Sequence, residues 1–555
     1  MAGLSGQPIL ILREGARREK GKEALENNIM AARAVAEAVR STLGPRGMDK
    51  LMVDSLGDVT ITNDGVTILQ EMDVQHPAAK MVVEAAKTQN DEVGDGTTTT
   101  AVIVGELLKK AEELIEMDVH PTVIVSGYRL ASDRAIEVLE SLAFDVSKND
   151  QDLLEKIALT AMTGKFSGTL STKLAEYVVK MVLFTAEETD GKTVVDLKKI
   201  IVEKKPGESM EESELVEGLI IDKDRVHTNM PKKTEQAKIA LINAALEAKD
   251  PETKAEITIT SSDQFKMFAD REKARIREVA DKVIASGANV VFCQKGIEDI
   301  AQHHLAKAGV MALRRVKRTD MKRLAKATGA NIVTNLDEMT PEDLGDAGLV
   351  EDRKVGGGHL TFVTGVAKGT VSLLLRGGTE QVVNNLQIAL DDALHAVAAA
   401  IEDQKMVAGG GATEVELSLR LKEYAATLVG REQLATDRFA DALDEIPKSL
   451  AENAGLNSID KLVAIKSRHE AGEKTSGLDV YTGEVVDMRE MGVIEPLRVK
   501  VQAIRSATDA AALILRIDDV IASKRTEMPP GGGMPGAGMG GGMGGMPPGM
   551  PPGMM

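Results

Sequence analysis

Three observations predict a multidomain fold that combines mostly α-helical parts with an α/β region. The chain has 555 residues, too many for one hydrophobic core, which suggests about two to four domains. Apolar residues make up 43% as in other globular proteins, but aromatic residues only 2%, so the cores must be aliphatic. Residues from about 218 to 369 alternate strand and helix patterns, whereas most of the remaining chain has helical periodicity.

Charge and cysteine content exclude several classes of protein. Lys and Arg total 68 against 86 Asp and Glu, and this net charge of −18 argues against general nucleic-acid binding. The basic segment 314–326 lacks stacking aromatics, which favours a solvated face. The single cysteine, Cys293, lies in the apolar run ANVVFC and is expected to be buried and unreactive. With no signal-peptide pattern and no membrane-spanning run, we expect a cytoplasmic protein without membrane partners.

The first part of the chain leads to a candidate carboxylate. Helical periodicity runs from about residue 24 to residue 42, and Gly44–Pro45 follows as a stop signal. Two strand-like runs, KLMVD and DVTIT, precede the NDG sequence at Asn63–Gly65, which is a strong tight-turn signal. Asp64 is either a residue of that turn or a carboxylate held at a strand end for a metal ion or a water molecule.

The stretch VGDGTTTT, residues 93–100, concentrates groups that bind phosphate. Gly94 and Gly96 allow the backbone to approach a ligand closely, and Asp95 offers hard oxygen ligands suited to Mg²⁺. Thr97–Thr100 open the helical pattern AVIVGELLKKAEELIEM, so their N–H groups and hydroxyls would favour an anion. The alternative is a DG hairpin turn followed by a threonine-capped helix.

Two glycine–lysine motifs have different meanings. Lys165 lies in a TGK break between helical patterns, where it is either solvated or within reach of a phosphate. Gly191–Thr193 has the sequence GKT, but a P-loop requires a glycine where Ala186 stands, so no P-loop is present.

A long charged helix, Asp263–Ala285, is predicted within the α/β region. Its Phe265 and Phe268 either form a contact surface or pack on a neighbouring strand. The adjacent residues His303 and His304 would diverge on a helix rather than share a metal ion.

Glycines and carboxylates recur in the C-terminal half. TVSLLLRGG, residues 370–378, is predicted to be a strand, and a long helix follows it with Asp391 and Asp392, only one of which can face inward. Gly409–Gly411 open another helix and offer a second place where backbone can approach a ligand.

The end of the chain is predicted to hold a hairpin, two helices and a tail. SGLDVYTGEVVDM indicates a hairpin around Thr482–Gly483, and two last helices are expected to reach Ser523. From Met528 onwards every residue is Met, Gly, Pro or Ala, a composition that cannot build a core.

Together these motifs resemble those of a group II chaperonin subunit of the archaeal thermosome type. The resemblance covers about residues 8–523 and rests on STLGPRGMDKL, ITNDGVTIL, DEVGDGTTTT, VVFCQKGIEDIAQHHLAKAG, LLLRGGTEQVV, VAGGGATEVEL, GLDVYTGEVVDM and LRIDDVI, in this order. One departure is NNLQIAL at Asn384–Leu390, where relatives usually carry an acidic–basic pair in the intermediate domain, and it leaves the strength of allostery open.

The resemblance implies the chaperonin fold, with a helical equatorial domain, a small intermediate domain and an α/β apical domain with a helical protrusion. The implied segments are 1–147 (equatorial), 148–217 (intermediate), 218–369 (apical, with the protrusion at about 245–280), 370–405 (intermediate), 406–527 (equatorial) and 528–555, a flexible Gly/Met/Pro tail.

It also implies an ATP site with Mg²⁺. The implied residues are Leu43, Gly44 and Pro45 along one wall, Gly96, Thr97, Thr98 and Thr99 at the phosphates, Asp95 as a Mg²⁺ ligand, Asp64 and Asp392 as the catalytic residues that position or activate water, Lys165 as a sensor of the γ-phosphate, Gly410 near the ribose, and Asp479 and Glu495 near the base and sugar.

The implied activity is ATP hydrolysis that drives protein folding. Unfolded proteins would be the clients, enclosed by stacked double rings of this subunit or of homologous subunits together, with a built-in lid. The sequence leaves the ring size open between about eight and about nine subunits. A phosphotransferase would need a second substrate pocket, for which the sequence has no candidate. A scaffold without hydrolysis would not need Asp64, Asp95 and Asp392.

Overall fold

The computed structural model describes residues 17–165, 169–247, 262–366 and 370–522. Contacts within the chain separate it into two units, Met1–Ala24 with Asp518–Met555, and Leu25–Ile517.

In the first unit, β1 (Arg17–Lys20) pairs with β21 (Asp519–Ala522) in antiparallel register. The prediction of a helix up to Ser523 is therefore wrong at its end, because the β-branched Val520 and Ile521 pair with a strand about 500 residues away in sequence, which local periodicity does not reveal.

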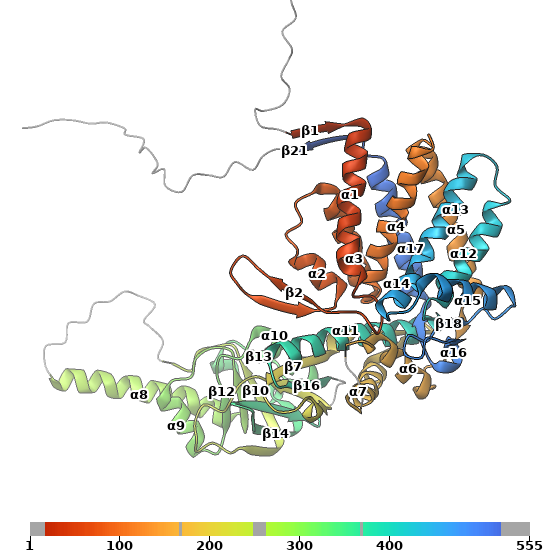
Figure 1. Ribbon diagram of the computed structural model, residues 1–555. Helices are drawn as coiled ribbons and strands as arrows, with labels where there is room; N and C mark the ends of the chain where they lie inside the picture. The colour runs from red at the N-terminus through yellow and green to blue at the C-terminus, as the bar shows by residue number, and fades with distance from the viewer. Residues whose placement is uncertain (1–16, 166–168, 248–261, 367–369, 523–555) are drawn as a thin grey trace, which may run out of the picture. The chain divides into compact units, whose positions relative to one another are not determined.

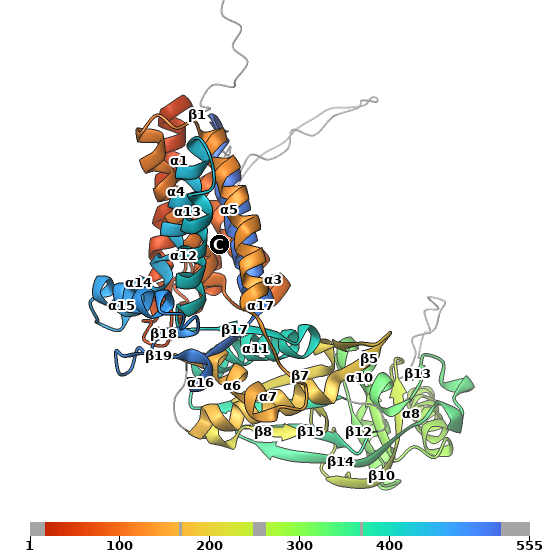
Figure 2. The same ribbon diagram turned by 90° about the vertical axis from the view of Figure 1, so that its right-hand side faces the viewer.

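In the second unit, helices from both halves of the chain share one aliphatic core. Its members come from Leu25 to Leu139 and again from Val415 to Leu515. Figures 1 and 2 show α4, α5, α13 and α17 running side by side, and Tyr128 and Phe439 stack edge to face between α5 and α13. The helices of this part are α1 (Gly21–Arg40), α2 (Gly65–Glu71), α3 (Pro77–Val93), α4 (Thr97–Glu116), α5 (Pro121–Leu142), α12 (Ala412–Ala425), α13 (Arg431–Leu443), α14 (Glu445–Asn453), α15 (Ser458–Glu470), α16 (Met488–Met491) and α17 (Leu497–Leu515).

A second core packs three helices on a small sheet. In this sheet β16 (Val371–Gly377) lies between β7 (Ile200–Pro206), which is parallel to it, and β8 (Glu214–Val216), which is antiparallel. The helices are α6 (Gln151–Met162), α7 (Thr169–Thr185) and α11 (Glu380–Asp403). In the segment NNLQIAL, Asn384 Oδ1 accepts a hydrogen bond of 2.8 Å from Lys204 Nζ. The hydrogen-bond partner of this lysine is therefore a neutral amide.

The α/β region is built around a seven-stranded sheet, whose residues contribute to three apolar clusters. The strand order is β12-β11-β10-β14-β15-β9, and β13 also pairs with β10. The long β14–β15 hairpin has no counterpart in the sequence prediction. The elements are β9 (Gly218–Ile221), β10 (Lys233–Ile242), α8 (Ser262–Ala285), β11 (Val290–Cys293), α9 (Asp299–Lys307), β12 (Met311–Leu313), α10 (Arg318–Thr328), β13 (Ile332–Val333), β14 (Gly345–Val355) and β15 (Gly358–Thr364).

Short elements complete the described chain. They are the hairpins β2 (Lys50–Val53) with β3 (Val59–Thr62), β5 (Ala186–Thr189) with β6 (Lys192–Val195), and β18 (Ser476–Leu478) with β19 (Val485–Asp487), the sheet of β4 (Phe144–Asp145), β17 (Lys405–Ala408) and β20 (Ile494–Pro496), and the 3-10 turns η1 (Leu197–Lys199), η2 (Met210–Glu212), η3 (Leu336–Glu338) and η4 (Pro341–Asp343). None of the helices in the described residues is long and apolar enough to span a membrane.

Several predictions about single residues can be compared with the structure. Cys293 is buried, as expected, and burial raises the pKa of its thiol to about 11, which keeps the thiol protonated. His304 pairs with Asp281, whereas the ring of His303 packs on that of His227, so the two histidines diverge as predicted.

Three predictions concern parts of the chain that the structure does not describe. The backbone of Phe265 and Phe268 lies in α8, but their side chains lie outside the described residues, as do residues 248–261 of the predicted protrusion and the tail from Met528. The domain boundaries stay a prediction.

Candidate functional site

A pocket of about 250 Å³ lies within the unit Leu25–Ile517 and gathers every site residue assigned from the sequence. Its walls come from segments that are hundreds of residues apart in sequence. The assigned residues that line it are Leu43, Gly44, Pro45, Asp64, Asp95, Gly96, Thr97, Thr98, Thr99, Lys165, Asp392, Gly410, Asp479 and Glu495.

The loop between α3 and α4 forms the pocket's anion-attracting side. Gly94 ends α3 and Gly96 caps α4, both in the left-handed region with φ of 71° and 80°, which a β-carbon would strain. The loop joins two helices rather than two strands, so the alternative of a DG hairpin is wrong. α4 begins at Thr97, so the unpaired N–H groups of its first turn and the threonine hydroxyls line the pocket. Asp95 Oδ1 accepts a hydrogen bond of 2.6 Å from Gly96 N, which fixes its carboxylate.

Two further side chains hold this loop in place. Gln89 is fully buried, and its Nε2 donates to Asp95 O at 2.8 Å and to Val499 O at 3.1 Å, which ties the loop to α17. A β-carbon on Gly94 would lie 2.3 Å from Cγ of His395, so glycine also allows α11 to approach the loop.

Asp64 lies where β3 passes into α2 rather than in a tight turn. The tight-turn prediction for Asn63–Gly65 is wrong because Asp64 is the N-cap of α2. Its Oδ2 accepts hydrogen bonds from Thr67 N at 2.9 Å and from Thr67 Oγ1 at 2.6 Å. The carboxylate is thus held rigidly at a strand end, and it lines the pocket.

Lys165 and Asp392 form a buried ion pair across the pocket, between the loop after α6 and helix α11. Burial raises the pKa of Asp392 to about 8, and the negative charges of Asp95 and Asp64 add to this rise, while Lys165 offsets only part of it. Burial alone would lower the pKa of Lys165, but Asp392, Asp64 and Asp95 together raise it. Even while Asp392 is protonated, the carboxylates of Asp64 and Asp95 outnumber the Lys165 ammonium, and this surplus of negative charge suits a bound cation.

Further carboxylates line the pocket. Asp479 Oδ1 accepts from Tyr481 N at 2.9 Å and Oδ2 from the Thr482 hydroxyl at 2.7 Å, and these bonds outweigh burial and lower the pKa of Asp479. Glu495, on β20, is 2.7 Å from the ammonium of Lys500, which is also 2.7 Å from Glu414.

Sequence reasoning missed four side chains of the site, namely Thr67, Gln89, Glu414 and Lys500. A signal for two of them exists in the sequence. Gln89 follows Val82 and Ala86 on the buried face of α3, and Lys500 precedes Ala503 and Ile504 on that of α17. A polar residue at a core-facing helical position needs a buried partner, so periodicity could have marked both.

A metal ion in this pocket would need ligands beyond the side chains of the protein. Within the described ranges, no group of three or more His, Cys, Asp and Glu side chains could hold a metal ion unaided. Mg²⁺ commonly binds through one or two carboxylates together with substrate phosphates. Asp95 beside the first turn of α4 fits this mode, with the remaining ligands supplied by a phosphate and water.

Comparisons with known proteins agree with this architecture. The sequence profile of the TCP-1/cpn60 chaperonin family matches residues 35–525. The chain belongs to this chaperonin family.

Relatives of known name specify the type of chaperonin. Thermosome subunit beta of Archaeoglobus fulgidus is 57% identical over 96% of this chain and 98% of its own length. A thermosome subunit of Methanopyrus kandleri is also 57% identical, over 94% of this chain and 95% of its own length. The solved open-state monomer of a group II chaperonin from Methanococcoides burtonii is 53% identical, with a TM-score of 0.58 over 77% of this chain and 100% of that one. This chain is thus a thermosome-type group II chaperonin subunit, and its function is ATP-dependent protein folding in double-ring complexes.

Proposed function

We propose that this chaperonin subunit hydrolyses ATP in the pocket and uses the energy to enclose and fold unfolded proteins. The observation that carries the proposal is the meeting of Asp64, Asp95 and Asp392 with Lys165 at the first turn of α4. Phosphoryl transfer requires donors for the phosphate oxygens, a carboxylate to orient water and neutralisation of charge. This pocket holds a group for each task.

The phosphates would lie at the first turn of α4. Gly96 and the threonines 97–99 offer N–H groups and hydroxyls to phosphate oxygens, and Asp95 would hold Mg²⁺ from the other side. The metal ion, when bound, supplies positive charge that neutralises the transferring phosphoryl group. Leu43, Gly44 and Pro45 would form an apolar wall, and Gly410, Asp479 and Glu495 would lie near the sugar and base.

Asp64 and Asp392 would position and activate the attacking water. In the present arrangement Asp392 is paired with Lys165. A γ-phosphate would compete for the Lys165 ammonium, because it carries more negative charge than a carboxylate. Lys165 would then bind the phosphate and leave the Asp392 carboxylate free to accept a proton from water. Only a nucleotide with a third phosphate would therefore release Asp392 from Lys165.

At the level of the assembly, we propose a cytoplasmic double ring with unfolded proteins as clients and a lid built from residues of about 245–280. The proposed domains are those of the chaperonin plan, and the separate apolar clusters of the described chain support them. Native mass spectrometry with and without Mg²⁺-ATP would test the assembly and count its subunits. A stable monomer or dimer would contradict self-assembly of this chain alone.

The decisive test of hydrolysis is Asp392→Ala. We expect ATP binding to persist and the turnover number to fall by about 10² to 10⁴, because a positioned general base contributes rate enhancement of that order. Equal turnover would refute the role of Asp392. The matched control is Asp441→Ala, which removes an aspartate of α13 whose partners are Lys422 and Arg438 and which does not line the pocket.

A further inference from the structure

A smaller cavity adjoins the pocket beside Lys165. We call it the side cavity; its volume is about 70 Å³, and its lining residues are Asp49, Thr62, Asn63, Gly164, Lys165, Asn385 and Ile388. Asn63 and Lys165 also line the pocket, so the two spaces are neighbours. Asp49 and Gly164 are exposed, which places the side cavity between the pocket and the solvent.

Three segments of the chain extend from the side cavity to the pocket. In Thr62–Asp64 the first residue lines the side cavity, the last lines the pocket and the middle one lines both. In the loop after α6, Gly164–Lys165 pass from one space to the other in the same way. On α11, Asn385 and Ile388 line the side cavity and Asp392 lines the pocket, and steps of three and four residues put them on one helix face. The side cavity therefore leads to the groups expected at the γ-phosphate.

Two polar contacts lie at the boundary of these spaces. Asn63 Nδ2 donates a hydrogen bond to Gly164 O at 3.4 Å, which is long for such a bond, so it costs little to break. The ammonium of Lys165, also at the boundary, is paired with Asp392. The proposed attraction of Lys165 to a γ-phosphate would break this pair as well. The boundary between the side cavity and the pocket can therefore open during turnover.

The groups of the side cavity suit an anion. The Lys165 ammonium is a donor for phosphate oxygens, and the Asn385 amide, which has no hydrogen-bond partner in the described part of the chain, offers further N–H groups. Among the described residues, Asp49 is the only carboxylate that lines the side cavity, and it is exposed and screened by solvent. The pocket, in contrast, presents the carboxylates of Asp64 and Asp95. A phosphate that is no longer joined to the nucleotide is thus repelled from the pocket and attracted to the side cavity.

Hydrolysis of ATP consumes one water molecule and leaves ADP and inorganic phosphate in the pocket. The phosphate would be formed beside Lys165 and Asp392, at the end of the nucleotide that adjoins the side cavity. We propose that the side cavity is the exit for inorganic phosphate, which leaves past Lys165 and Asn385 while ADP is still bound. The inference rests on the proposed nucleotide site and adds to it the route and the order of product release.

The test follows the reverse path, because entry and exit through one passage meet the same barrier. The assembled full-length protein is saturated with Mg²⁺-ADP, and the uptake of radiolabelled vanadate, an analogue of inorganic phosphate, is measured over time. We expect the wild-type rate to stay constant as the ADP concentration rises further, because ADP does not have to leave. A rate that falls with rising ADP concentration would show that the anion enters only through the empty pocket, and it would overturn the proposal.

Two variants that keep the size of the side chain change the charge of the side cavity in opposite directions. Asn385→Asp adds a negative charge to the path and should slow vanadate uptake by about tenfold. Asp49→Asn removes one and should speed uptake by about twofold, less because Asp49 is exposed. The double variant should lie between them. Equal rates for all variants would overturn the proposal. If Asn385→Asp does not fold, Asp49→Asn decides alone, and an unchanged rate then overturns it.

Asn384→Asp is the matched control. Asn384 is the neighbouring asparagine on α11, but it accepts a hydrogen bond from Lys204 and does not line the side cavity. This variant should leave vanadate uptake unchanged, whereas slowing equal to that of Asn385→Asp would indicate a general effect of charge on α11 and overturn the proposal. Calorimetry of Mg²⁺-ADP binding separates the two levels of inference. A wild-type protein that binds ADP but takes up no vanadate beside it overturns the exit route alone, whereas one that binds neither ADP nor ATP overturns the proposed function.

Discussion

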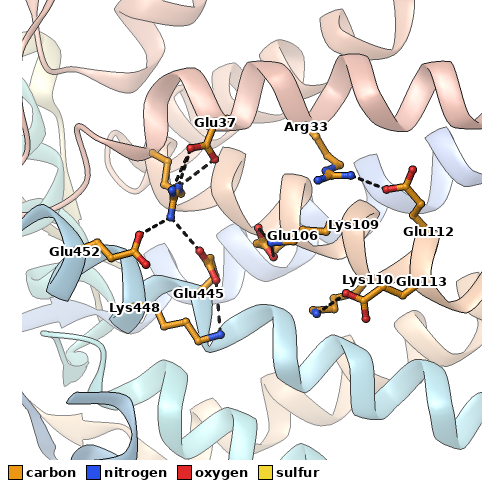
Figure 3. A network of polar contacts seen from close by, with 11 residues as sticks. Arg33, Glu37, Glu106, Lys109, Lys110, Glu112, Glu113, Glu445, Lys448 and Glu452 are labelled. Carbon is orange, nitrogen blue, oxygen red and sulfur yellow. Dashed lines mark hydrogen bonds and ion pairs between the residues drawn. The ribbon is translucent and has the colours of Figure 1, made fainter. Parts of the chain in front are cut away.

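Two charged clusters of the helical part use the same residue types with different burial. Figure 3 shows the first, here called the α1 network, in which Arg33 pairs with Glu112 and further ion pairs join Lys109 to Glu106 and Lys110 to Glu113. The second is the pocket, with the pairs Lys165–Asp392 and Lys500–Glu414.

The α1 network is largely open to water. Arg33 and Glu112 are 39% and 31% exposed, so solvent screens their attraction. In the pocket, Lys165 and Asp392 are 15% and 14% exposed. Burial there shifts pKa values and leaves a charge imbalance that a ligand can relieve. An ion pair therefore indicates function when it is buried and unbalanced in charge, and indicates little when it is solvated.

The largest effect that would sharpen this comparison is expected for Asp95→Asn. The change keeps the size of the side chain and its hydrogen bond from Gly96, but it removes the charge that would bind Mg²⁺. We expect ATP turnover to fall by at least about 100-fold, because the variant loses the metal ion that stabilises the charge of the transition state. Turnover measured across a range of Mg²⁺ concentrations checks this. The matched change Glu112→Gln in the α1 network should leave turnover unchanged.

The pH dependence of kcat/KM for ATP should follow Asp392. Its pKa is raised to about 8, and the ionised carboxylate is the form that accepts a proton from water. Below this pKa most molecules carry the protonated form, so kcat/KM should rise about tenfold from about pH 6.5 to about pH 7.5 and level off above about pH 8. A rate profile of the wild-type protein measures this rise. A flat profile over this interval would contradict the assignment of Asp392.

A smaller effect is expected for Thr67→Val. Valine has the same shape but cannot donate the hydroxyl hydrogen bond of 2.6 Å to Asp64 Oδ2, while the bond from the backbone N–H remains. We expect turnover to fall by about tenfold with little change in ATP affinity, since Asp64 loses orientation rather than charge. Steady-state kinetics separate kcat from KM. If kcat is unchanged, Asp64 is oriented by its N-cap bond alone.

The smallest effects are expected in the α1 network, to which Arg40 of α1 also belongs through its pairs with Glu445 and Glu452. Arg40 contacts Glu445 at 3.1 Å and Glu452 at 2.7 Å, so it joins α1 to α14, and Arg40→Met should destabilise the protein by about 1 kcal/mol. Arg33→Met should cost less than about 0.5 kcal/mol, because the pair with Glu112 is more exposed. Neither variant should alter ATP turnover, because neither side chain lines the pocket. Chemical denaturation measures both costs, and a larger cost for Arg33 would reverse the comparison.

Local sequence patterns predicted most of the helices and many of the residues that line the pocket. The glycines around Asp95 and the threonines that follow it indicated a phosphate loop, because a turn with left-handed residues before a helix depends on neighbours in sequence. The motifs from STLGPRG to LRIDDVI indicated the family, and the family match over residues 35–525 confirmed it.

Only the tertiary structure decided which polar groups are buried together. The strand β21 depends on a partner at the other end of the chain, so helical periodicity mispredicted it. The segment Asn63–Gly65 was predicted to be a tight turn because a strand-to-helix cap and a turn share the same short sequence. The pairing of Lys165 with Asp392, and of Lys500 with Glu414 and Glu495, joins segments that are distant in sequence. Sequence alone does not show how strongly these charges interact, because the free energy of an ion pair depends on its burial in the folded structure.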